Sequence, residues 1–183
     1  MTDLFLERYF ERGTTAERVI RNSQGAADCM GMHKVVWNGS FLSMDGRRLF
    51  CWFTAPDQES ARIALRQAGA DYRIMWRCSI HEAPGVVEED IAAANVLVER
   101  SFEEPVTLEK IQDIEDAGFD CLDSRNVRFI RTFFSHDRKR MICLYEAPDA
   151  ESVRQAQREA GVPFNDAWSF EALGPADLAR ADP

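Results

Sequence analysis

The stretch CWFTAPDQESA at residues 51–61 returns as CLYEAPDAESV at residues 143–153. Their first residues, Cys51 and Cys143, are 143 − 51 = 92 positions apart. Each stretch has an apolar run typical of a strand, and then Ala-Pro-Asp, in which the Asp is suited to cap a helix. The sequence therefore predicts that one strand-then-helix element occurs twice.

The same offset holds along most of the chain. Glu7 and Arg8 meet Glu99 and Arg100, and Trp76 meets Trp168. Matches at a fixed spacing indicate a tandem duplication of one unit of roughly 80 residues. We therefore predict a first repeat at 1–84, a linker at 85–94, a second repeat at 95–174 and a tail at 175–183.

Each copy shows the pattern strand, helix, strand, strand, helix, strand. In the first copy we expect strands near 4–10, 35–42, 49–54 and 73–80, with Asp57 as the cap of the second helix. In the second copy the strands are expected at 96–102, 127–134, 141–146 and 167–173. The fold class is therefore α+β: two fused ferredoxin-like βαββαβ units. An apolar sheet face without helices must be covered, so we expect the two copies to pack as an intramolecular α/β barrel.

Both copies resemble a known family, and the resemblance is stronger in the second copy. The run from Cys143 to Val153, the strand that opens Val98-Glu99-Arg100, and Ala160-Gly161 look like the signature of a bacterial nickel-binding-protein-like family of unknown function. The resemblance implies a dimeric α/β barrel of ferredoxin-like units, built here within one chain. It also implies histidine ligands near the first strand and along the second helix, and neither copy has His at those places. We therefore expect that nickel binding is not retained.

Composition argues against several classes of partner. The net charge is −9, and the basic residues form no long cluster, which argues against a nucleic-acid backbone as partner. No apolar run is long enough for a membrane span, and the first residues do not look like a secretion signal. We expect a cytoplasmic protein whose five cysteines are mainly small buried residues.

Glu7 and Glu99 are the first candidates for a catalytic role. Period-two alternation places Phe5, Glu7 and Tyr9 on the sheet face opposite Leu4 and Leu6. A carboxylate in a partly dry space can act as a general acid or base. The alternative is that each Glu only pairs with an Arg, such as Arg131 or Arg77, and joins elements of the fold.

Positions where the copies differ supply the other candidates. Glu146 and Glu171 replace Thr54 and Ser79, and with Glu99 they would form a carboxylate cluster suited to a hard cation or to proton transfer. His33, where the second copy has Arg125, is a candidate acid, base or single metal ligand, although a lone His is more often structural. The catalytic candidates are Glu7, Glu99, His33 and Glu146.

A ligand-binding group is predicted from aromatic and polar residues. Trp37 and Trp52 stand where the second copy has Phe129 and Leu144, and aromatic side chains commonly line small-molecule pockets, although core packing is the alternative. The substrate-binding candidates are Trp37, Trp52, Arg131, Glu171 and Tyr9.

Function is predicted only in outline. No nucleotide-binding, nucleophile-elbow or zinc motif occurs in the sequence. The leading hypothesis is a small-molecule-binding barrel that acts as a cofactor-independent isomerase, lyase or cyclase, with one asymmetric site. A metal-binding module and a noncatalytic sensor or assembly protein are the alternatives. We expect no cofactor, no nucleic-acid or membrane partner, and a pseudo-dimer within one chain that is able to form a further homodimer.

Overall fold

The computed structural model describes residues 1–178, apart from the side chains at 114, 115 and 117. The chain forms two compact units. The first contains Met1–Cys78 and the segment that starts at Glu171, and the second contains Ser79–Phe170. The limits of the units fall inside two strands, so each of these strands contributes residues to both units. Of the predicted tail, Pro175–Leu178 form helix α7, and 179–183 lie outside the described residues.

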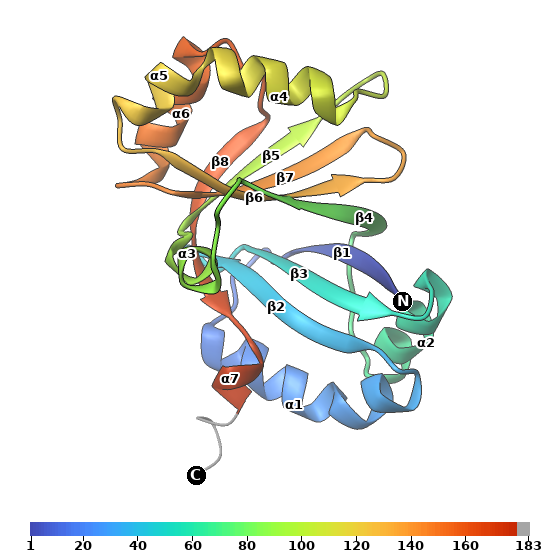
Figure 1. Ribbon diagram of the computed structural model, residues 1–183. Coiled ribbons are helices and arrows are strands. Elements are labelled where there is room, and N and C mark those ends of the chain that lie inside the picture. Colours follow the sequence, from blue (N-terminus) through green and yellow to red (C-terminus); the bar gives the residue numbers. More distant parts are fainter. Residues whose placement is uncertain (179–183) are drawn as a thin grey trace. The chain divides into compact units, whose positions relative to one another are not determined.

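The first unit has the predicted order of elements. They are β1 (Thr2–Tyr9), α1 (Ala16–Met32), β2 (Val36–Ser43), β3 (Arg48–Ala55), α2 (Gln58–Gln67) and the start of β4 (Ile74–Glu82). Strand β3 pairs with β1 and β2, and β1 also pairs with β4, all antiparallel. Figure 1 shows α1 and α2 on one face of this sheet.

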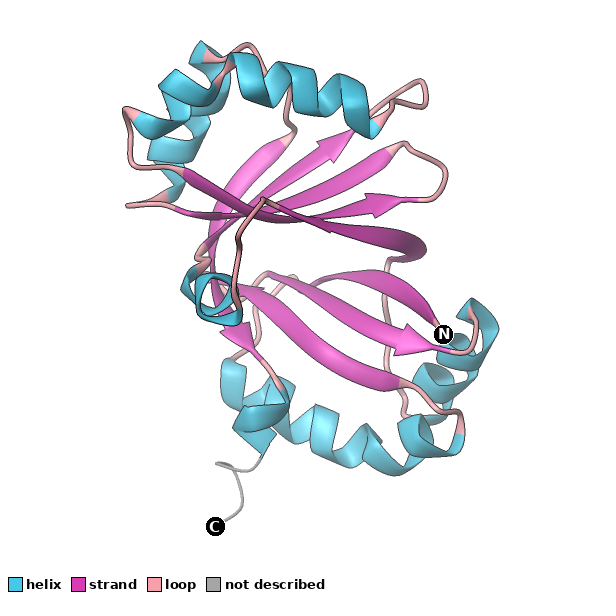
Figure 2. Cartoon of the chain, viewed as in Figure 1, coloured by secondary structure: helices cyan, strands magenta, loops and turns pink. Residues whose placement is uncertain are grey.

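The second unit repeats the order with two changes. It contains β5 (Val96–Ser101), α4 (Leu108–Ala117), α5 (Phe119–Asp123), β6 (Arg128–Ser135), β7 (Arg140–Glu146), α6 (Ala150–Glu159) and the start of β8 (Asp166–Leu173). Strand β7 pairs with β5 and β6, and β5 pairs with β8, again antiparallel. Figure 2 shows α4, α5 and α6, which Figure 1 labels, on one face of its strands. The fold is therefore α+β, as predicted, and the barrel stays a prediction.

Local sequence explains the elements that the copies share. Asp57 and Asp149 each accept a hydrogen bond from a backbone N–H three residues later, at 2.7 Å, and so cap α2 and α6. Gly69 and Gly161 follow these helices with φ of +66° and +69°, a conformation that favours glycine. The N-cap of α1 is Thr15, whose hydroxyl accepts a hydrogen bond from the backbone N–H of Arg18 at 3.3 Å.

Each unit has a helix-side core. In the first unit Leu4 and Leu6 of β1 pack with Val19 and Ile20 of α1, so the predicted alternation of β1 is confirmed. In the second unit Val96 and Val98 of β5 pack with Ile111 and Leu122. Burial raises the pKa of Cys51 to about 11, which fits its predicted role as a small buried residue.

Two elements differ from the sequence prediction. The predicted linker contains a six-residue helix, α3 (Glu88–Ala93), with Asp90 accepting a hydrogen bond from the backbone N–H of Val87. The first helix of the second copy is interrupted at Gly118, whereas α1 is continuous over 17 residues. None of the helices in the described residues is long and apolar enough to cross a membrane.

Candidate functional site

A pocket of about 1180 Å³ lies entirely within the second unit. Its lining comes from α4 and α5, from β6 and β7 with the residues next to them, from the segment His81–Val86 that ends β4 and follows it, and from Asp90 of α3. This volume is at or above the upper end of the range usual for small-molecule sites. The pocket therefore lies on the helix side of the β6–β7 hairpin.

The pocket has an apolar interior and a charged rim. Its large apolar side chains are Val86, Leu108, Ile111, Phe119, Leu122, Val127, Phe129 and Met141, together with the thiol of Cys143. Its carboxylates are Glu82, Asp90, Glu109, Asp116, Asp123 and Glu146. Such a lining is suited to a molecule with an apolar body and a polar end.

The corresponding place in the first unit is packed with protein. Leu178 of α7 packs against the helix-side core of that unit, and Gln24 of α1 donates a 3.1 Å hydrogen bond to the Leu178 carbonyl oxygen. At the offset of 92, the counterpart of Leu178 is Val86, which lines the pocket. The smaller Val86 and the break between α4 and α5 leave this place open in the second unit.

Three ion pairs, made by two arginines, hold the rim. Arg128 contacts Asp90 of α3 and lies 3.6 Å from Glu146, the end residue of β7. Arg131 donates from Nε to Glu82 at 2.9 Å. The hydrogen bond from Arg128 lowers the pKa of Asp90 and keeps that carboxylate ionised. These pairs attach α3 and the end of β4 to β6.

His81 is the histidine of the pocket lining. Its Nε2 is 2.8 Å from Ser79 Oγ, and burial lowers its pKa below the ordinary value of 6.5. The imidazole is therefore neutral at pH 7, the form in which histidine binds metals or accepts a hydrogen bond.

We expect His81→Gln to make the thermal stability less sensitive to acid. Because the folded-state pKa of His81 is lowered, its contribution to stability is complete above pH 6.5 and is lost as the pH falls. The Tm should therefore fall less in His81→Gln than in the parent between pH 7 and pH 5. His136→Gln, in the β6–β7 turn, is the matched control. Parallel curves of Tm against pH for parent and His81→Gln would refute this expectation.

Glu7 and Glu99 occupy equivalent positions and make equivalent contacts. Trp76 Nε1 donates to Glu7 at 2.9 Å, and Trp168 Nε1 donates to Glu99 at 2.6 Å. Glu7 is only 5% exposed, whereas Glu99 is half-buried. Neither residue lines the pocket. Each carboxylate thus has an indole donor, a partner that sequence reasoning did not consider.

The predicted carboxylate cluster is not assembled within the second unit. Val96 and Glu99 pair with Tyr145 and Ile142, so Glu99 and Glu146 lie toward opposite ends of the β5–β7 ladder. Glu171 is exposed and belongs to the first unit. Within the described residues, no three His, Cys, Asp or Glu side chains are placed to hold a metal ion. Of the three carboxylates, Glu146 alone lines the pocket.

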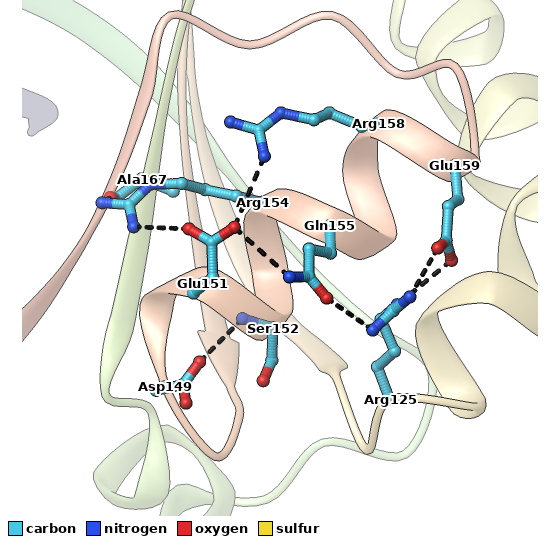
Figure 3. A network of polar contacts seen from close by, with 9 residues as sticks. All are labelled: Arg125, Asp149, Glu151, Ser152, Arg154, Gln155, Arg158, Glu159 and Ala167. Atoms are coloured by element: carbon cyan, nitrogen blue, oxygen red, sulfur yellow. Dashed lines mark hydrogen bonds and ion pairs between the residues drawn. The ribbon is translucent and has the colours of Figure 1, made fainter.

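His33 lies at the end of α1, before β2 begins at Val36. It is the cap residue after α1, is half-buried, and lies 2.9 Å from Gln67 of α2. Its counterpart Arg125 donates to Glu159 of α6 at 3.1 Å, within the polar network shown in Figure 3. Both pairs connect the end of the first helical segment of a copy to its second helix. The two copies therefore differ here in which side chains make this contact. The acid–base role of His33 remains an untested prediction.

The predicted ligand-binding residues are dispersed. Trp37 packs against the helix-side core and donates to Ser40 Oγ at 2.9 Å, while Trp52 donates to Asp3 at 2.9 Å. Tyr9 is 41% exposed, and its hydroxyl lies 3.4 Å from Glu7. Arg131 contacts a residue of the pocket rim.

Sequence reasoning missed a polar network in the core of the second unit. Arg100 is 2% exposed, and its Nη2 donates to Tyr145 Oη at 3.1 Å and to Gln157 Oε1 at 3.0 Å. The first copy has Phe53 and Leu65 in place of Tyr145 and Gln157. The repeat alignment contained this signal, because two apolar core positions become polar together.

The charged residues of the pocket rim were also missed, although the repeat alignment contains them too. Asp116 and Asp123 stand where the first copy has Gln24 and Gly31, and Arg128 stands where it has Val36. Comparing the charges of the two copies would have identified these positions.

A ferredoxin-like α+β protein with a pocket in its second copy is the class that these observations define. The family model described as nickel responsive protein SCO4226-like matches residues 97–169, which confirms the resemblance for the second copy. The crystal structure of SCO4226 from Streptomyces coelicolor A3(2) is similar at 14% identity with a TM-score of 0.37, covering 46% of this chain and 99% of that chain. No curated protein matches this chain.

Solved structures similar to the whole chain come from other proteins. A mutant chlorite dismutase from Candidatus Nitrospira defluvii, in complex with cyanide, is 10% identical with a TM-score of 0.50, covering 98% of this chain and 94% of that chain. A protein from Thermus thermophilus described as heme-binding is 8% identical with a TM-score of 0.49, covering 98% and 94%. At these identities the likeness concerns the fold.

The prediction that no cofactor is bound is corrected by these comparisons. Two proteins that share this fold are described as chlorite dismutases: the one solved with cyanide, and the putative chlorite dismutase TA0507, which is 12% identical with a TM-score of 0.53, covering 98% of this chain and 97% of that chain. The lack of histidines on the first strand and the second helix argued against nickel binding. It does not argue against other metal-containing groups. The inference of no cofactor was therefore wrong.

Proposed function

We propose that the second unit binds a small organic molecule in the pocket between α4–α5 and the β6–β7 hairpin. The observation that supports this is the open volume of about 1180 Å³, with an apolar interior and a polar rim, at a place that the first copy fills with α7. Burial of an apolar body there would contribute roughly 25 cal/mol per Å² of surface removed from water.

A neutral, apolar fluorescent dye such as Nile red tests the proposal. We expect saturable binding, and we expect it to weaken at least tenfold in Val86→Trp, because a larger side chain at 86 reproduces the filling by Leu178 in the first unit. Val87→Trp is the matched control, since Val87 is adjacent, is 54% exposed and does not line the pocket. Equal binding by the two variants, with both folded, would contradict the proposal.

A more specific proposal is that the pocket also catalyses a reaction of the bound molecule. An isomerase, lyase or cyclase needs a group that moves a proton at the bound molecule. Glu146 is the predicted catalytic residue that lines the pocket, and we assign it this role. Glu7 and Glu99, engaged by Trp76 and Trp168, are assigned to positioning within their own sheets.

Heme is the second candidate occupant, and one residue favours it. His81 lines the pocket and has the lowered pKa of a neutral imidazole, which is a common axial ligand of heme iron. His81 would hold the iron and Arg128 would receive a propionate. Heme would supply redox chemistry. A heme titration followed by absorbance tests it: saturation at one equivalent, lost in His81→Ala and retained in His136→Ala, supports heme, and unsaturable binding excludes it.

The barrel predicted from the sequence is proposed on the argument that an apolar sheet face must be covered. A compact chain of this length has a radius of gyration of roughly 16 Å. Small-angle X-ray scattering should give about this value, and a clearly larger one would contradict the barrel.

A further inference from the structure

The positions that form the interior of the pocket are apolar in both copies, whereas most positions that form its rim differ in charge between the copies. Val19, Met30 and Leu49 of the first copy correspond to Ile111, Leu122 and Met141 of the second, so these positions stay apolar. The charged positions behave differently. Asp116, Asp123, Glu146 and Glu82 correspond to Gln24, Gly31, Thr54 and Gly174, whereas Glu109 and Asp90 have acidic counterparts, Glu17 and Asp182.

Charge therefore accumulates where the cavity is open. The rim has six carboxylates, and two guanidinium groups contact it: Arg128, which is shared by Asp90 and Glu146, and Arg131, which contacts Glu82. In the described part of the chain, Glu109, Asp116 and Asp123 have no ion-pair partner, and Asp116 accepts a 2.7 Å hydrogen bond from Gln112. The pocket thus presents an excess of negative charge around an apolar interior.

We infer that the pocket takes an amphiphilic cation, a molecule with an apolar body and a protonated or quaternary amine. This inference rests on the proposed function and specifies the ligand class of the same site. The apolar body would lie against Ile111, Phe129 and Met141, and the cationic end would lie among the carboxylates. A cation at the rim gains Coulomb attraction from carboxylates that a neutral end does not, and an anionic end is repelled.

Competition against bound Nile red separates the ligand class from the pocket itself. Octylammonium and octanol have the same eight-carbon chain, octanoate has seven apolar carbons, and the three differ in the charge of the end. We expect octylammonium to displace the dye at a concentration about tenfold below that of octanol, with octanoate the weakest. The preference for octylammonium should decrease as salt rises, because salt screens charges at the rim.

Variants that restore the residues of the first copy complete the test. In Asp116→Gln/Glu146→Thr, dye binding should persist while the preference for octylammonium over octanol falls to about one. Asp113→Asn, on the same helix but outside the pocket lining, should leave the preference unchanged. Dye binding with equal displacement by all three competitors would overturn the ligand class and leave the pocket standing. No dye binding would overturn the proposed function itself.

Discussion

The double variant Tyr145→Phe/Gln157→Leu is expected to lose about 3 kcal/mol of unfolding free energy. These substitutions introduce the residues of the first copy, and they remove two acceptors from the guanidinium of Arg100, which is 2% exposed. Hydrogen bonds to charged groups contribute about 1.5–3 kcal/mol each, and a buried charge that loses its partners is costly. Urea unfolding followed by tryptophan fluorescence measures the change.

A third substitution identifies the cause. Adding Arg100→Met removes the buried charge, so the triple variant should regain most of the lost stability. Arg8→Met is the control in the first copy. Arg8 is half-buried, and its substitution is expected to change the unfolding free energy by less than about 1 kcal/mol. A double variant within about 0.5 kcal/mol of the parent would show that the network does not stabilise this core.

Glu7→Leu is expected to lower the unfolding free energy by about 2 kcal/mol. Leucine cannot accept the hydrogen bond from Trp76 Nε1, and an unsatisfied buried donor costs about 1–3 kcal/mol. Glu7→Gln keeps an acceptor oxygen and should cost less. If Glu7→Leu is neutral, the indole contact does not contribute to stability.

The repeat supplies the matched comparison. Glu99→Leu removes the same contact with Trp168, but Glu99 is half-buried, so water can replace part of what is lost. We therefore expect a smaller loss for Glu99→Leu than for Glu7→Leu in the same urea experiment. Equal losses would contradict the role assigned to burial.

The sequence was sufficient for the elements that depend on local chemistry. Asp57 and Asp149 as helix caps, Gly69 and Gly161 after their helices, and the alternation of Leu4 and Glu7 on β1 all depend on a few neighbouring residues. The helix α3 was missed because its segment is short, acidic and poorly buried, with little pattern to detect.

The candidate site depends on packing that no local pattern reports. The pocket exists because Val86 is smaller than Leu178 at the equivalent place and because Gly118 interrupts the first helix of the second copy. Neither Val in place of Leu178 nor Gly in place of Ala26 is an unusual substitution in itself. Differences between the copies were the right signal, but His33 and Trp37 were chosen for their chemistry, whereas the changes that shape the pocket are small or acidic residues.

The central claim is that the second unit, and not the first, holds a small-molecule site. Amide chemical shifts in a ¹H–¹⁵N NMR titration with octylammonium test it most directly. We predict saturable shifts at Val86, Thr132, Cys143 and Glu146, which line the pocket, and none of comparable size at their counterparts Leu178, Ser40, Cys51 and Thr54. Shifts of equal size in the two copies, or shifts confined to the first, would contradict the claim.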